Sequence, residues 1–89
     1  MSILNWKHRT TADEARDTLR TEFERLGYGD KVQWTGHELE ASVPMFLEVK
    51  GRITDDAVVL DKCAGMASSA FLGKCRDMLA KIFPEGAEA

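Results

Sequence analysis

The spacing of apolar residues changes twice along the chain, and the changes predict two helices on either side of a set of strands. Apolar side chains recur every three or four positions over residues 12–26 and again over residues 66–83, as on a helix with one buried face. Between them, over residues 31–61, apolar and polar positions alternate with the period of a strand. Residues 3–8 alternate loosely and predict a short first strand. We therefore expect the order (β)-α-β-β-β-β-α.

The first predicted helix has clear signals at both ends. Thr11 to Glu14 match a capping box, in which the Thr11 hydroxyl accepts from the Glu14 amide and the Glu14 carboxylate reaches back to the Thr11 amide. Gly27 is the expected left-handed stop. The apolar stripe between these signals consists of Ala12, Ala15, Leu19, Phe23 and Leu26.

The second predicted helix has a wider apolar face and weaker ends. Its stripe consists of Ala67, Phe71, Cys75 (or Lys74), Met78 and Ile82, widened by Leu72 and Leu79. Gly73 lies inside this helix, where glycine is unfavourable, and we expect it to permit close packing on the sheet. Pro84 and Gly86 end the helix, and residues 84–89 are expected to form a frayed tail.

The alternating stretch divides into strands joined by short turns. Residues 31–43 form a predicted hairpin around Gly36-His37, and Pro44, which has no N–H to donate, interrupts the ladder. Residues 47–53 and 57–61 follow as strands on either side of the Asp55-Asp56 turn. Such connections are too short for parallel crossovers. We expect an α+β domain: a four-stranded antiparallel meander with two amphipathic helices on one face and a possible short N-terminal strand.

Composition removes several classes of protein. The chain has 89 residues and is expected to form one domain over 1–89, with its core in 8–83. A net charge of −3 argues against a nucleic-acid binder that neutralises phosphates. No apolar run approaches the ~18 residues of a membrane span. The N-terminus has no apolar segment behind a basic start, so we expect no secretory signal, a cytoplasmic location and reduced thiols.

The residue types that carry chemistry are present without the spacing that chemistry requires. Cys63 and Cys75 lack metal-ligand spacing, and neither His8 nor His37 has a ligand partner one helical turn away. Ser68-Ser69 has no nucleophile-elbow context and fits a helix start or turn. Cys75 is expected among apolar neighbours, where a thiol is unreactive. We therefore predict no metal, no cofactor and no catalytic site.

Several segments resemble one protein family. The resemblance covers about residues 8–83 and begins with His8, a short polar stretch and Glu14-Ala15-Arg16 opening a long helix. It continues through the strand-turn-strand from Val32 to Glu40 and the hairpin from Gly51 to Leu60, and it closes with the amphipathic helix. These features are similar to the polyhydroxyalkanoic acid system proteins, small bacterial domains associated with polyhydroxyalkanoate granule regions. The resemblance implies an association with storage granules and no particular reaction.

Three functional hypotheses remain open from the sequence. The first is a non-enzymatic domain that binds a polyester granule surface or another granule protein through an exposed apolar patch contributed by Trp6, Met45 and Phe46. The second is a small carrier whose sheet and helix enclose an acyl chain among Trp34, Phe46, Phe71 and Met78. The third is a homodimerisation module that pairs through a sheet face or edge.

Overall fold

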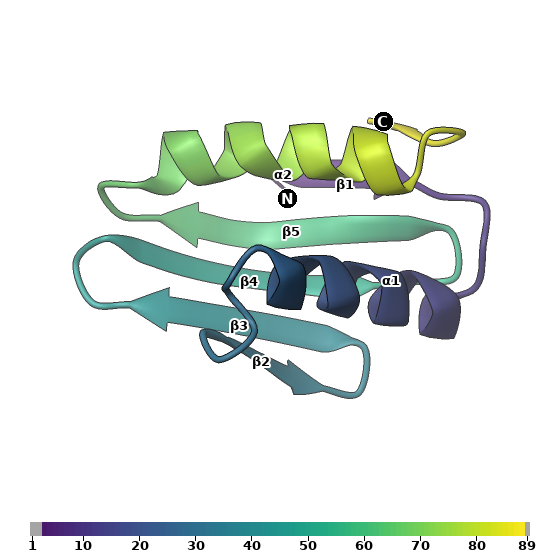
Figure 1. Cartoon of the computed structure of the whole chain (residues 1–89). Coiled ribbons are helices and arrows are strands. Elements are labelled where there is room, and N and C mark those ends of the chain that lie inside the picture. The colour runs from purple at the N-terminus through teal and green to yellow at the C-terminus, as the bar shows by residue number, and fades with distance from the viewer. Residues whose placement is uncertain (1–2, 89) are drawn as a thin grey trace.

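The computed structural model describes residues 3–88, so Met1, Ser2 and Ala89 of the predicted domain 1–89 lie outside the described residues. The elements follow in the order β1 (Leu4–Lys7), α1 (Ala12–Arg25), β2 (Val32–Thr35), β3 (Glu38–Val43), β4 (Leu47–Ile53), β5 (Ala57–Ala64), α2 (Ser68–Ile82) and β6 (Ala87–Glu88). The strands form one antiparallel sheet in the order β2-β3-β4-β5-β1-β6. The helices run in opposite directions over one face of this sheet (Figure 1). The predicted α+β class is confirmed, with six strands in place of four or five.

The C-terminal segment is the main correction to the predicted elements. Residues 84–89 were expected to fray, yet β6 pairs with β1, and the Arg76 Nε donates to the Glu88 carboxylate at 3.0 Å. Gly86 makes this approach possible, because a Cβ at that position would lie 1.9 Å from the Lys7 carbonyl oxygen. A strand of two residues has no measurable period, so the hydrophobic pattern carries no sign of it.

One of the two hydrogen bonds predicted for the capping box of α1 is present, and the other is replaced. The Thr11 hydroxyl accepts from the Glu14 amide at 3.2 Å. The Glu14 carboxylate accepts from the Thr10 hydroxyl, and does not reach back to the Thr11 amide. One residue into the helix, the Asp13 carboxylate lies 2.6 Å from the His37 Nε2 in the β2–β3 turn. The first turn of α1 is therefore held to that hairpin as well as capped.

The core is a single apolar layer between the helices and the sheet. Its most deeply buried large side chains are Leu4, Leu19, Leu79, Val49 and Val58. Two details differ from the predicted stripes. Leu26 is 44% exposed because α1 ends at Arg25, and the buried position one turn earlier belongs to Glu22. The space beside Gly73 is open to 4 Å within the described residues, so this glycine does not serve close packing on the sheet.

The opposite face of the sheet is polar. Side chains of neighbouring strands form ion pairs across it, with the Lys62 Nζ 2.9 Å from the Glu48 carboxylate and the Arg52 guanidinium 3.3 Å from Asp61. Both ion pairs are diagonal, and the register places Lys50 directly opposite Lys62, so the Glu48 carboxylate offsets a like-charge pair. Neither helix in residues 3–88 has the length and apolar character needed to cross a membrane.

Candidate functional site

The β3–β4 turn and the β5–α2 loop meet at one end of the molecule. The Ala67 amide donates to the Phe46 carbonyl oxygen at 2.8 Å, and the Met66 amide lies 3.4 Å from the Met45 carbonyl oxygen. Gly65 permits this contact, because it has a φ of 107° and a Cβ there would lie 2.4 Å from the Phe46 carbonyl oxygen. Two loops that are about twenty residues apart in sequence thus form one surface.

This surface presents large apolar side chains to solvent. Met45 is 85% exposed, Met66 80% and Phe46 55%. Among the large apolar residues of the described chain, these three are the most exposed. We call them the apolar end. A cluster of exposed apolar side chains, unlike a single one, is typical of an interaction surface.

Met45 adopts an unusual backbone conformation. The Phe46 amide donates to the Val43 carbonyl oxygen at 3.0 Å, Pro44 holds the second position of the turn, and Met45 has a φ of 69°. This is the geometry of a type II turn, whose third position favours glycine or asparagine. Among residues 3–88, Met45 is the one non-glycine residue with positive φ.

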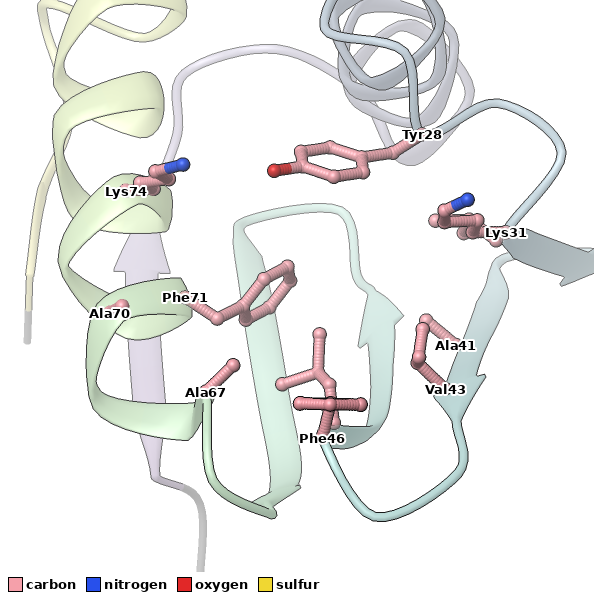
Figure 2. A pocket seen from close by; sticks show the side chains of 11 residues that line it. Tyr28, Lys31, Ala41, Val43, Phe46, Ala67, Ala70, Phe71 and Lys74 are labelled. Carbon is pink, nitrogen blue, oxygen red and sulfur yellow. The ribbon is translucent and has the colours of Figure 1, made fainter.

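An apolar pocket of about 210 Å³ lies beside the apolar end, between the two helices and the sheet. Figure 2 shows its floor and walls, which come from β3, β4, the β3–β4 turn and the first half of α2. The apolar lining consists of Val32, Ala41, Val43, Phe46, Leu47, Ala67, Ala70 and Phe71. The pocket is open to solvent on one side, so it is a groove and not an enclosed cavity.

Polar groups lie at the mouth of the pocket. Tyr28, which follows α1, places its ring across the mouth with its hydroxyl directed toward the side of Lys74, and Lys31 lies on the other side (Figure 2). No carboxylate belongs to the described lining, although the chain has 15 acidic residues. Lys31 and Lys74 form no ion pair with any side chain in residues 3–88. The mouth therefore has a local positive charge on a protein whose net charge is −3.

The residues predicted to form binding surfaces are only partly brought together. Phe46 and Phe71, which the acyl-carrier hypothesis grouped together, both line the pocket. Trp34 is half-buried and lines a separate depression with Phe23 and Glu24. Met78 is buried in the core.

The predicted exposed patch of Trp6, Met45 and Phe46 is divided between the two ends of the sheet. Trp6 pairs with Val58, and Val58 lies opposite Ile53, the last residue of β4. Met45 lies just before Leu47, the first residue of the same strand. Trp6 is also half-buried and packs against the core. Met66 takes its place in the patch.

Few local signals identify the site residues that sequence reasoning missed. Met66 has one local signal, because it is a bulky apolar residue that directly follows a loop glycine. Tyr28, Lys31 and Lys74 belong to the site because α1 ends opposite α2, and that arrangement depends on long-range packing.

His8 has a structural role. It is buried, its Nδ1 accepts from the Thr10 amide at 3.2 Å, and its Nε2 lies 2.9 Å from the Thr54 carbonyl oxygen. Because the amide donates and the carbonyl accepts, the geometry assigns a neutral ring with its proton on Nε2. The Nε2 contact joins the end of β1 to the β4–β5 turn, and the Nδ1 contact holds the segment between β1 and α1.

The cysteines are free thiols, and their surroundings disfavour the reactive thiolate. Burial, with a smaller contribution from Cys63, raises the pKa of Cys75 to about 12. Burial also raises the pKa of Cys63, whose Sγ lies 3.6 Å from the Ser68 carbonyl oxygen. Within residues 3–88, no group of three or more His, Cys, Asp or Glu side chains is placed to hold a metal ion.

Comparison of the chain with protein-family models, with curated proteins and with solved structures found no match.

Proposed function

We propose that the chain is a non-enzymatic binding domain that attaches to the surface of a hydrophobic polyester, as on a polyhydroxyalkanoate granule, through its apolar end. The observation that carries this proposal is Met45, a large apolar side chain held almost fully in solvent on a backbone that disfavours it. The similarity of the sequence to granule-region proteins supports the choice of surface.

Met45 has no evident use in folding. The left-handed conformation costs a non-glycine residue about 1–2 kcal/mol, and an asparagine at the same position largely avoids that cost. A side chain that is 85% exposed recovers little of it through burial. A strained and exposed apolar residue is better explained by contact with something outside the domain.

The composition of the apolar end suits a surface without fixed shape. Two of its three side chains are methionines, which are flexible and polarizable and adapt to irregular apolar contacts. A net charge of −3 weakens attraction to an anionic bilayer, whereas an uncharged polyester exerts no such repulsion.

Adsorption to amorphous polyhydroxyalkanoate particles tests the proposal. Met45→Asn and Met66→Ser are each expected to weaken adsorption about 5-fold, the loss for roughly 1 kcal/mol of apolar contact. Met45→Asn should at the same time raise the free energy of unfolding by about 1 kcal/mol, because the turn strain is relieved. The matched control is Leu26→Asn, which removes an exposed apolar side chain outside the apolar end.

Two outcomes would contradict the proposal. Adsorption of Met45→Asn at the parental level, or an equal loss in Leu26→Asn, would show that the apolar end is not the contact. A concentration-dependent dimer in sedimentation that the double substitution Met45→Asn/Met66→Ser abolishes would assign this surface to self-association instead.

A further inference from the structure

We propose that the pocket between α1 and α2 is a binding site for one acyl carboxylate, with the hydrocarbon chain in the apolar interior and the carboxylate at the mouth beside Tyr28, Lys31 and Lys74. The proposal goes beyond polyester adsorption, because it concerns a dissolved molecule and a saturable site. Phe46 belongs to both the apolar end and the pocket, whereas Met45 and Met66 do not line the pocket, so the methionine variants test polyester adsorption alone.

The pocket interior fits a hydrocarbon chain. Its eight apolar lining residues offer few polar groups to hold water, so a hydrocarbon chain that covers them removes apolar surface from water. A volume of about 210 Å³ is smaller than the ~300–1,000 Å³ of pockets for drug-sized ligands. The space therefore suits one short unbranched chain better than a peptide segment, which needs a longer groove.

The mouth fits an anionic head group. Two ammonium groups and one hydroxyl donor surround it, while carboxylates are missing from the described lining. Asp77 and Glu22 line a neighbouring depression that shares Tyr28 and Lys74 with the pocket, so Lys31 is the donor of the mouth that lies apart from them. A carboxylate is the acyl head group that such donors would favour, and flexible lysines bind it as point charges. An uncharged alcohol of the same length would gain less from the lysines.

Titration of the full chain with straight-chain carboxylates tests this assignment, with binding followed by NMR chemical shifts and calorimetry. We expect saturable one-to-one binding in which each added methylene strengthens the affinity about 4-fold until the pocket is full. Lys31→Met and Lys74→Met should each weaken binding about 2- to 5-fold, and added salt should reduce the effect of either lysine. Lys50→Met on the polar face of the sheet is the control and should leave binding unchanged.

A second pair of variants tests the location of the site. Ala70 lines the pocket and is itself exposed, so Ala70→Phe fills the space without crowding the core and should abolish binding. Ala80→Phe is the matched control, because Ala80 is an exposed alanine of the same helix outside the described pocket linings.

Different results would overturn the anionic head group and the location of the site. Equal affinity for carboxylates and the matching alcohols, with no effect of the lysine variants, would overturn the anionic head group. Undiminished binding to Ala70→Phe, or partition without saturation, would overturn the site itself. Met45→Asn/Met66→Ser should bind carboxylates normally, and Ala70→Phe should still adsorb to polyester, so a failure of this proposal is distinguishable from a failure of the other.

Discussion

Each end of the layer between the helices and the sheet contains an aromatic side chain of α2 or its C-terminus, but the two rings are buried to different extents. At one end, which we call the closed end, the buried ring of Phe83 lies 5.7 Å from the ring of His8, and His8 uses both its nitrogens. At the other, Phe71 is half-buried above an open pocket and Met45 faces solvent. Small domains bury a limited fraction of their surface. The closed end has a surface depression of about 200 Å³ beside Phe83, yet that ring is buried, whereas at the open end the Phe71 ring stays half-exposed to the pocket.

Replacing an aromatic ring at each end measures this difference directly. Phe83→Ala removes a buried ring and should lower the free energy of unfolding by about 3–5 kcal/mol. Phe71→Ala removes a half-buried ring beside existing space and should cost about 1–2 kcal/mol. Urea denaturation of both variants checks the comparison, and equal losses would show that the two ends are equally well packed.

A methyl group at Gly65 should disturb the open end specifically. Gly65→Ala and Gly27→Ala both place alanine at positive φ, which costs about 1–2 kcal/mol in either variant. The Gly65 variant also forces a Cβ against the Phe46 carbonyl oxygen, whereas the described surroundings of Gly27 are open to 4 Å. We expect Gly65→Ala to cost about 1–3 kcal/mol more in thermal or urea unfolding. Similar losses would show that the two loops separate easily.

The pH dependence of stability tests the ion pairs of Glu22, which contacts Arg25 on its own helix and Lys81 on α2. The Arg25 side chain donates to the buried Glu22 and lowers the pKa of that carboxyl below its ordinary value of 4.5, and Lys81 lowers it further. Because the unfolded chain then binds a proton more readily, the stabilisation is present above about pH 4.5 and is lost as pH falls through the lowered pKa. Glu22→Gln should flatten the fall in urea midpoint between neutral and acidic pH.

Glu85→Gln is the control for this measurement, because Glu85 is exposed and makes no ion pair with the described side chains. Its urea midpoints should follow the parental curve. An acid-induced fall that is as steep in Glu22→Gln as in the parent would assign the loss of stability to other carboxylates.

The smallest expected effect concerns α2 itself, which runs from the open end to the closed end. Gly73 is exposed and has open space beside it, so Gly73→Ala should raise the free energy of unfolding by about 0.5–1 kcal/mol through helix propensity alone. The reciprocal change Ala80→Gly should lower it by a similar amount. A destabilised Gly73→Ala would show that this position needs glycine for a reason outside the helix.

Local periodicity predicted most of the fold. The two helices, the Gly36 turn and the four central strands follow from spacing and turn residues within short windows. The extension of β5 to Ala64 could not be predicted in this way. A register shift between Lys50 and Gly51 in the β4–β5 pairing interrupts the alternation of apolar and polar positions. The added strand β6 depends on the Gly86 contact, which is long-range.

The candidate site was less predictable than the fold. Phe46 and Phe71 were named from sequence, yet Trp34 and Met78 were grouped with them on residue type alone. Helical spacing shows that Met78 lies on the buried face of its helix. It does not show which part of the core the side chain contacts. Met66 and Lys74 belong to the site through the meeting of two distant loops and two antiparallel helices.

The strand β6 has a consequence for association between copies of the chain. Free strand edges invite pairing with other chains, and proteins limit that hazard with short or covered edges. Here β1 is flanked by a strand of two residues, and the opposite edge, β2, has four. Both borders of the sheet therefore offer short runs of backbone for intermolecular hydrogen bonding. A protein that gathers at high local density on a hydrophobic particle would benefit from such borders, since crowding would otherwise favour fibrils.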